Sequence, residues 1–552
     1  MITGYPTVDH LRMRSGSLMW VCFGCQAASP VRSVPVTHLR PGRTPLQRRP
    51  QRSPDAAGSI TGAILQNCAL TTLPPCSVTG ASRTTPYGVL LTLSSPGRVH
   101  IPSDNLMKTL DPNQLTLQSY HNALKDVDSL IINPADFLPD DEAQDHYEKV
   151  FKSQIARVMY KYVARPADSK RKLPMDPPDI ELISHEQPKI HMMKLMNESD
   201  NSAEGIGQVM EALRRQSRLE PGEFFGRFQL IDGDLGTAQI FNAIRSLRFP
   251  SEHCDHSLNN VSFTLGAAHT LWNIAHTILT HHFGNSKAMD DLGVWRYLQA
   301  LGIPPEKVIQ KKDFTKMLQY MEQVHEATLW YCLRHVMGEH DSTITEDLPV
   351  IPTSNWNAIV NQCYNQFCSH EARRAAQSSP KLYNLFIRLQ DFSTVIEANR
   401  SMKRGDIGRL INVWKMWSIM TQSLPGLTHY SAYLPRLILL ITKILPPSLS
   451  ELIRHSILVS PSGRPNHFVA KDFLLETHNY WLKYFYVRGG IGTQIERLQE
   501  LFSSNIPIIV GPSMSNKVIN HCSCYKHSRG STRWPKKIRF LMEGLGRGHY
   551  NP

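Results

Sequence analysis

Apolar side chains recur at helical spacing through most of this chain, and that pattern restricts the fold more than any other feature. From residue 238 onward, successive segments place apolar residues at i, i+3, i+4 and i+7, as amphipathic helices do. The segments are 238–248, 263–282, 289–301, 314–336, 356–376, 382–400, 407–422, 430–444, 469–486 and 494–503. Because few segments alternate with a period of two, the sequence predicts a helix-rich α/β or α+β fold with a small sheet.

The predicted helical domain begins near residue 101, where the composition changes. The run DPNQLTLQSYHNALKDVDSLI has a capping Asp111, and DDEAQDHYEKVFKSQIARVMYKYV has the pattern of a long amphipathic helix. A polar, proline-rich connector at 164–188 precedes a further helical segment, SAEGIGQVMEALRRQ. The best candidate for a buried strand, at 227–231, follows that segment.

The two ends of the chain differ from this domain. Residues 1–100 are rich in Pro, Ser, Thr and Arg without apolar periodicity, which predicts a mostly disordered region. We expect a helix-rich domain at 101–510 and a basic flexible tail at 511–552. The formal net charge of the chain is +13, and basic residues are concentrated at both ends.

This positive charge favours an acidic partner, and we expect DNA or RNA. In the tail, Lys536, Lys537 and Arg539 are the candidate nucleic-acid contacts, because clustered basic side chains attract phosphates. The alternative is that both basic ends are solvated segments without a partner.

The sequence predicts no membrane-spanning segment and no zinc module. The apolar run 434–445 is interrupted by Pro435, Arg436 and Lys443, so it is too short and too charged to span a bilayer. The cysteines form no disulfide framework, and the runs EHCDH and HCSCYKH lack a second ligand pair at zinc-module spacing. Free thiols favour a reducing compartment inside the cell, and the nucleus is the location that we expect.

The run FQLIDGDLGTAQI places two acidic residues directly after the predicted strand. Asp232 and Asp234 are two residues apart, so on a strand they share one face. One interpretation is structural, with Asp234 or Thr237 capping the helix that DLGT begins. The other interpretation is a site for a hard cation, because Mg²⁺ prefers carboxylate oxygens. The sequence leaves both interpretations open.

A metal site needs a further acid, and the run KDFLLETHNYWLKYF offers one. Glu476, Asn479 and Lys483 lie at i, i+3 and i+7 of the predicted helix 469–486, so they share a face. On the metal interpretation, Asp232, Asp234 and Glu476 bind Mg²⁺, and Asp234 and Glu476 are the catalytic acids. On the alternative interpretation, this stripe is a solvated helix face.

Other polar positions are interpreted structurally. Asp406 in RGDIGRL follows Gly405 and is expected to cap the helix at 407–422. His269, Trp272 and His276 share one face of the predicted helix 263–282, and we expect core or groove residues there rather than metal ligands.

Several segments then occur in a familiar order: DSLIINPADFLPDD, MNESDNSAEGIGQVMEAL, IDGDLGT, FTLGAAHTLWNIAH, RGDIGRLINVWKMW and VSPSGRPNHFVAKDFLLETHNYWLKY. By these segments the chain resembles, from about residue 98 to 509, the fungal family with the domain of unknown function 6589 (DUF6589). The acidic turn and the histidine-bearing helix of that family are similar in layout to transposase domains of the RNase H type. The resemblance implies a degenerate RNase H-like core with large helical insertions.

The resemblance also implies a transposon-derived, nucleic-acid-associated protein, although the chain departs from the family pattern. The family has an upstream segment that carries a first acidic residue, and here the Pro/Arg-rich start stands in its place. The family pattern has a histidine directly after the late glutamate, whereas here Thr477 follows Glu476 and the histidine is His478. Tyr433 occupies a position where the family pattern has an acidic residue. We therefore expect no catalysis; an active chain would be a Mg²⁺-dependent nuclease or transposase. The alternative is a non-catalytic helical scaffold for protein interactions.

Overall fold

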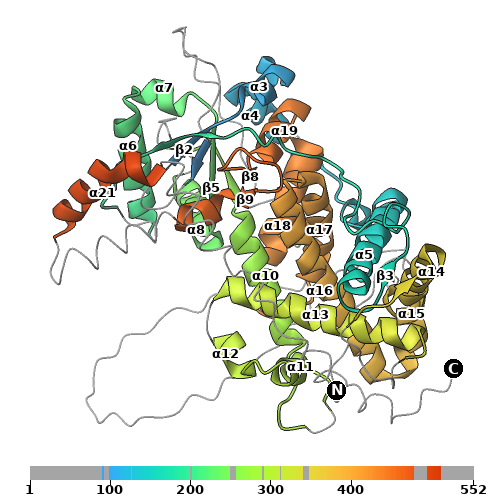
Figure 1. The fold of residues 1–552 in the computed structure, drawn as a ribbon. Helices are drawn as coiled ribbons and strands as arrows, with labels where there is room; N and C mark the ends of the chain where they lie inside the picture. Colours follow the sequence, from blue (N-terminus) through green and yellow to red (C-terminus); the bar gives the residue numbers. More distant parts are fainter. Residues whose placement is uncertain are drawn as a thin grey trace, which may run out of the picture. The chain divides into compact units, whose positions relative to one another are not determined.

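The computed structural model combines one mixed sheet with a large set of helices (Figure 1). It describes residues 90–92, 98–125, 127–198, 202–248, 251, 257–288, 291–310, 313–339, 347–477 and 494–510. The helix-rich character and the small sheet expected from the sequence are confirmed for these residues.

The main sheet has five strands in the order β4-β2-β1-β5-β6. The strands are β1 (Leu90–Thr92), β2 (Arg98–Ile101), β4 (Lys189–Met192), β5 (Gln229–Gly233) and β6 (Val261–Leu265). Strands β4, β2 and β1 are antiparallel neighbours, whereas β5 is parallel to β1 and to β6. The register places Asp232 of β5 between Thr92 of β1 and Thr264 of β6.

Strand β5 lies in the core of this region. All five of its residues are buried, as expected for a central parallel strand covered on both faces. Ile231 packs in one apolar cluster with Val261 of β6, Ile206 of helix α6 (Ala203–Ser217) and Phe241 of helix α8 (Leu235–Leu247). The chain therefore runs from a buried strand directly into a helix, and Asp234 is the N-cap of that helix.

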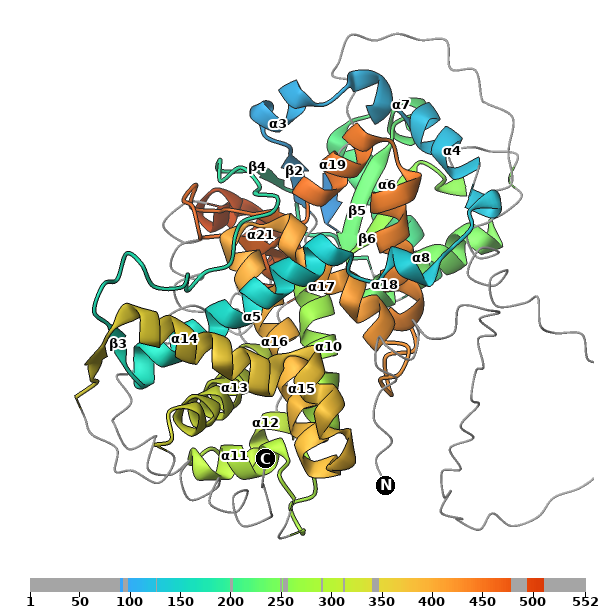
Figure 2. The same ribbon diagram turned by 90° about the vertical axis from the view of Figure 1, so that its right-hand side faces the viewer.

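Helix α16 (Pro380–Arg404) is the centre of the helical region (Figure 2). It packs against α5 (Asp141–Tyr162), α10 (Ala267–His281), α13 (Phe314–Val336) and α17 (Ile407–Met420). The remaining helices are α3 (Asp104–Thr109), α4 (Leu117–Lys125), α7 (Pro221–Phe225), α11 (Val294–Ala300), α12 (Pro305–Gln310), α14 (Thr353–Cys363), α15 (His370–Ala375), α18 (Tyr430–Leu439), α19 (Pro447–His455) and α21 (Ile495–Val510). Two-residue strands form the pairs β3 (Arg165–Pro166) with β7 (Val350–Ile351) and β8 (Leu458–Val459) with β9 (Val469–Ala470).

Most of the predicted helices occur close to their predicted bounds. Helix α13 has the predicted ends, and α17 differs only at its C-terminus. The predicted segments 356–376 and 430–444 contain π-helical turns, at Tyr364–Cys368 and Leu440–Ile444, which separate or end regular helices. Helix α19 was not predicted from the sequence.

Three boundaries drawn from the sequence require correction. The predicted helix 263–282 begins instead with the end of strand β6, and α10 starts only after Gly266. The predicted helix 469–486 begins at Lys471 after strand β9, and its residues 478–486 lie outside the described part. Strand β1 and most of β2 fall within 1–100, where no regular structure was expected.

Within the described residues, no helix has the length and apolar character needed to cross a membrane.

Candidate functional site

The polar residues of greatest interest lie where the parallel strands β5 and β6 end. In sheets of this kind, ligands bind outside the carboxyl ends of the strands, because helix N-termini and loop side chains meet there. A small pocket opens at this edge. Its lining includes Asp232, Thr264, Gly266, Ser456 and Lys471.

Asp232 at the end of β5 is paired with Lys471. The distance from Lys471 Nζ to Asp232 Oδ1 is 3.5 Å, and the side chains of Lys471 and Asp232 are only 3% and 6% exposed. In an interior of low dielectric constant, opposite charges at this distance attract strongly. Asp232 therefore already has a cationic neighbour.

Asp234 has the structural role that the first interpretation assigned to it. It is the N-cap of α8, and its Oδ1 accepts a hydrogen bond of 2.8 Å from the backbone N–H of Thr237. This bond satisfies one of the amide groups that the first turn of a helix leaves unpaired. The structural interpretation is confirmed, and the predicted catalytic role of Asp234 stays a prediction.

Asp472 lies at the N-terminus of helix α10. Its two carboxylate oxygens accept hydrogen bonds from the backbone N–H groups of Ala268, at 3.2 Å, and His269, at 2.9 Å. The N-cap residue of α10, Gly266, has no side chain that could make these bonds. A carboxylate from a distant segment therefore caps α10, where the helix dipole favours negative charge.

Gly266 leaves the space that this contact needs. A Cβ atom added at Gly266 would lie 2.7 Å from Cγ and 2.9 Å from Cβ of Asp472, and still closer to Oδ2. Such distances are too short for carbon atoms that are not bonded. Glycine at this position therefore allows the helix that starts at Lys471 to approach α10.

The imidazole of His269 in α10 lies between the carboxylates of Asp472 and Glu476. Its Nδ1 lies 2.9 Å from Asp472 Oδ2, and its Nε2 lies 3.9 Å from Glu476 Oε1. Burial alone would lower the pKa of the imidazole, but the hydrogen bond to Asp472 and the carboxylates of Glu476 and Asp234 outweigh it and raise that pKa. Glu476 and Asp234 are therefore both near His269.

Tyr430, the first residue of α18, fixes the next turn of α10. Its hydroxyl donates to the carbonyl of His269 at 3.3 Å and accepts from the side-chain amide of Asn273 at 3.2 Å. Burial raises the pKa of Tyr430, so its hydroxyl keeps its proton. Trp272 stacks on Phe314 with ring centroids 5.2 Å apart, which completes an ordered wall beside His269.

The predicted metal ligands are not gathered around one position for an ion. Asp232 is paired with Lys471, Asp234 caps α8, and Glu476 lies beside His269. Among the described residues, no three side chains of His, Cys, Asp or Glu are grouped so that they could hold a metal ion. The residues present therefore do not fit a Mg²⁺ centre.

Sequence reasoning did not identify Lys471 and Asp472 as site residues. The only local signal was their place four or five positions before Glu476 in KDFLLE, where i and i+4 share a helix face. His269 was assigned to the core or groove, and its contacts with carboxylates were not expected. Lys536, Lys537 and Arg539 lie outside the described residues, as do Asn479 and Lys483.

Asp406 confirms the other capping prediction. It is the N-cap of α17, and its Oδ1 accepts a hydrogen bond of 3.1 Å from the backbone N–H of Arg409. The same carboxylate also accepts backbone N–H groups from Ile180 and Glu181, so it joins the connector 164–188 to the helical region.

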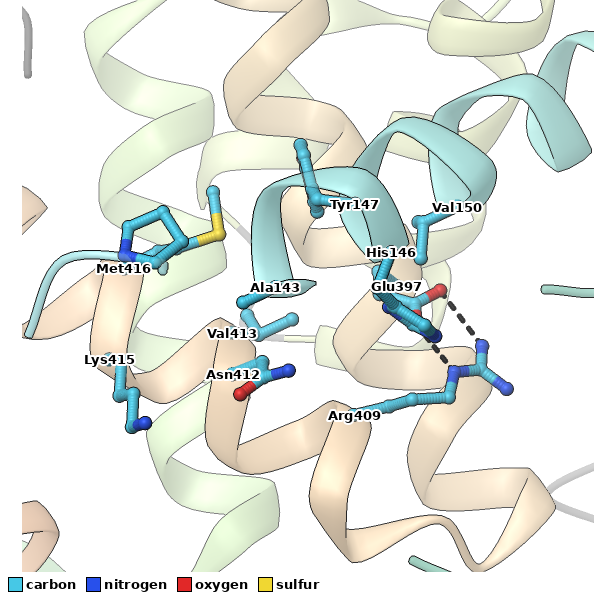
Figure 3. Close-up of a pocket in the computed structure, with 11 residues that line it drawn as sticks. Ala143, His146, Tyr147, Val150, Glu397, Arg409, Asn412, Val413, Lys415 and Met416 are labelled. Atoms are coloured by element: carbon cyan, nitrogen blue, oxygen red, sulfur yellow. Dashed lines mark hydrogen bonds and ion pairs between the residues drawn. The ribbon is translucent and has the colours of Figure 1, made fainter. Parts of the chain in front are cut away.

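A second small pocket lies between α5, α16 and α17 (Figure 3). The ion pair between Glu397 and Arg409 forms part of its wall, with two hydrogen bonds of 2.6 and 2.9 Å. Apolar side chains such as Val150, Val413 and Met416 form much of the rest. Because Glu397 and Arg409 satisfy each other and much of the remaining wall is apolar, we assign the pocket to helix packing.

Comparison with protein-family models matches residues 128–512 to the family of unknown function DUF6589. Comparisons with curated proteins and with solved structures give no match.

Proposed function

The chain belongs to the family of unknown function DUF6589, and from its strand-edge site we propose that it is a nucleic-acid-binding protein that does not cleave its ligand. We further propose that it descends from a transposase of the RNase H type and retains a degenerate form of that core. The observation that carries the proposal is the ion pair of Lys471 with Asp232 at the carboxyl edge of β5.

The sheet supports the proposed ancestry. Three antiparallel strands come first in the chain, and two strands parallel to the first of them follow, with helices α6 and α8 between. We take the resulting order β4-β2-β1-β5-β6, with antiparallel strands first and parallel strands after them, as support for the proposed RNase H-like ancestry. An analogy at the level of the fold sets only an expectation, so the activity must be argued from the side chains.

The site chemistry supports the absence of cleavage. Phosphodiester cleavage assisted by metal ions needs converging carboxylates that are free to bind the ion. Here Asp232 has an ammonium neighbour, Asp234 is engaged in a helix cap, and Thr92 is the β1 residue beside Asp232. No acidic residue occupies the described part of β1.

The charge of the chain supports nucleic acid as the partner. The formal net charge is +13, and at the strand edge Lys471 pairs with Asp232 while His269 lies beside Asp472. Lys536, Lys537 and Arg539 belong to the basic tail, which we propose as a phosphate-binding segment.

The test is the salt dependence of binding to a labelled DNA duplex and to an RNA of the same sequence. The logarithm of the binding constant should fall linearly with the logarithm of the salt concentration. Replacing Lys536, Lys537 and Arg539 with Ala should make that slope shallower, by about 1 for each phosphate that the three side chains neutralise.

A matched control removes the same charge elsewhere. Lys170, Arg171 and Lys172 lie in the connector, where Lys170 and Arg171 are exposed. Their replacement with Ala should leave the slope unchanged. Binding that does not respond to salt, or an equal change of slope in both triple variants, would remove the tail from the proposal.

A second candidate function is a helical interaction scaffold, and the capping roles of Asp234 and Asp406 favour it. On that proposal the acidic residues only stabilise helices, and the chain binds neither DNA nor RNA at low salt. The same titration therefore separates the two candidates.

A further inference from the structure

The connector between β3 and β4 brings acidic side chains against basic side chains of the helical region. Its residues 167–188 form no helix (Figure 2). Asp176, Asp179 and Glu181 lie in it, and each forms an ion pair with a residue of a different helix. Because these partners follow the path of the connector, they form a row along it. This cationic row consists of Arg157 of α5, Arg404 of α16, and Arg454 and His455 of α19.

Arg404 holds Asp179 with two parallel hydrogen bonds. Nε donates to Oδ1 at 2.9 Å, and Nη2 donates to Oδ2 at 2.6 Å. The third nitrogen, Nη1, donates to the side-chain oxygen of Asn466 at 2.8 Å, which fixes the orientation of the guanidinium. A guanidinium presents the same two donors to a pair of phosphate oxygens. The contact with Asp179 is therefore of a kind that a nucleic-acid phosphate also makes.

Glu181 occupies the far end of the row. Its carboxylate accepts a hydrogen bond of 2.6 Å from Arg454 Nη1, and its other oxygen lies 3.0 Å from His455 Nε2. Burial would raise the pKa of Glu181, but the hydrogen bond to His455 and the charge of Arg454 outweigh it and lower that pKa. The backbone of Glu181 is held separately, since its N–H donates to Asp406 and its carbonyl accepts from Ile407.

Water reaches the pairs of this row. The side chains of Arg404 and Asp179 are 39% and 33% exposed, and those of Arg157 and Asp176 are 37% and 78% exposed. Ion pairs in contact with water are weak, so a phosphate competes well with such a carboxylate. We propose that the cationic row is a second phosphate-binding surface, and that Asp176, Asp179 and Glu181 occupy it in place of nucleic-acid phosphates. The ligand is that of the proposed function, whereas the surface is separate from the basic tail.

The test compares the wild-type full chain with the neutralised variant Asp176→Asn/Asp179→Asn/Glu181→Gln. The amides keep the shape of the carboxylates and remove their charge. A labelled DNA duplex is titrated with each protein at several salt concentrations. The neutralised variant should bind at least about tenfold more tightly at low salt. Its slope of log binding constant against log salt should be steeper by about 3, one for each arginine that gains a phosphate.

A control variant removes the same charge from ion pairs that form no row. It is Glu148→Gln/Glu211→Gln/Glu500→Gln, which separates three pairs on α5, α6 and α21, those with Lys152, Arg214 and Arg497. Both variants therefore have the same net charge and the same number of released basic side chains. Because the control leaves these side chains scattered, its slope should stay within about 1 of the wild-type value.

Removing the row should cancel the gain. In the neutralised variant, the further substitutions Arg157→Gln, Arg404→Gln and Arg454→Gln should return the slope to the wild-type value. The same three substitutions in the wild-type chain should change the slope by less than about 1, because carboxylates already occupy these side chains.

A neutralised variant whose slope equals that of the control, or whose gain remains without the three arginines, would overturn the proposal. Circular dichroism verifies that each variant is folded. Should the neutralised variant fail to fold, Asp176→Asn alone provides the test, because this side chain is 78% exposed and the other pairs stay intact. Its slope should be steeper than that of Glu500→Gln by about 1, and equal slopes contradict the proposal.

The basic tail and the cationic row can fail separately. If the wild type binds no nucleic acid and the neutralised variant does, the proposed function fails and the cationic row stands. If the wild type binds through its tail and neutralisation adds nothing, the cationic row fails and the proposed function stands. Absence of binding in both chains contradicts both proposals.

Discussion

At the scale of single residues, short-range contacts hold the side chains at the strand edge in place. Gly266 leaves space for the Asp472 side chain. Asp472 caps α10 and forms a hydrogen bond with the His269 ring, and Asp234 caps α8. Each contact joins a residue to a backbone amide or a charged group of another element, so single substitutions should have defined effects.

Replacing Gly266 with Ala should destabilise the protein by about 1–3 kcal/mol, as overpacking does, because the new Cβ atom collides with Asp472. Gly222 in α7 is the matched control, since a Cβ atom there meets nothing within 4 Å. Denaturant unfolding of both variants checks this. Equal free energies of unfolding for the two variants would mean that Asp472 can move aside.

Replacing Asp234 with Ala should lower the free energy of unfolding by about 1 kcal/mol, the usual cost of removing an N-cap. Asp234→Asn should cost much less, because the Asn side chain caps helices almost as well as Asp. Chemical denaturation compares them. A large destabilisation in Asp234→Asn would show that the charge of Asp234, and not its hydrogen bond, matters for folding.

His269 should make stability depend on pH. Its pKa is raised above the usual value of about 6.5, so its pairing with Asp472 contributes fully below that pH and is lost as pH rises through the raised value. The wild type should therefore exceed His269→Gln in free energy of unfolding by more at pH 6 than at pH 9.

The control for this pH effect is His276→Gln. His276 lies on the same side of α10 and forms no ion pair in the part of the chain that is described. Its replacement removes an imidazole from the same helix without removing a contact to Asp472. A His269→Gln profile parallel to the wild type would contradict the coupling between His269 and Asp472.

At the scale of helices and strands, a buried ion pair joins α16 to α17. The side chains of Arg409 and Glu397 are 3% and 2% exposed, and two hydrogen bonds connect them. Replacing Glu397 with Gln should cost about 3–5 kcal/mol, because it leaves a buried charge without its partner.

The double variant Glu397→Gln/Arg409→Met tests this reason for the destabilisation. It should be more stable than Glu397→Gln alone, since neither charge remains in the interior. Thermal unfolding monitored by circular dichroism gives the comparison. A double variant less stable than the single one would show that packing, not charge, dominates this contact.

Helices were predictable from the sequence where local signals decide them. Asp313 caps α13 and an apolar stripe follows, so both ends of α13 were found. Strand β6 was not predicted, because no polar segment separates VSFTL from the largely apolar run GAAHTLW that follows it. Its pairing with β5, which local sequence does not indicate, makes this segment a strand. Strands β1 and β2 are short, and β1 pairs with a strand more than a hundred residues later.

The candidate site was predictable only in part, for the same reason. Asp232 and Asp234 follow the one strand that the sequence indicated, and the cap at Asp234 is local. The contacts of Asp472 with Ala268 and His269 join segments far apart in the chain, and no spacing rule indicates them. The pairing of Lys471 with Asp232 is equally non-local.

At the scale of the whole molecule, the basic residues that we expect to bind nucleic acid lie in other segments than the carboxylates of the strand edge. At the described strand edge, Lys471 pairs with Asp232 and His269 lies beside Asp472, whereas the net charge of +13 is concentrated toward the ends of the sequence. Phosphates should therefore be attracted by basic segments while no free metal centre acts on them. The chain should bind nucleic acid and leave it intact.

The most direct test follows supercoiled plasmid DNA on an agarose gel after incubation with the full chain and Mg²⁺ or Mn²⁺. We predict retarded but uncut plasmid, with the wild type and Asp234→Ala giving the same pattern. Conversion to nicked circles by the wild type but not by Asp234→Ala would contradict the claim that the chain binds nucleic acid without cleaving it.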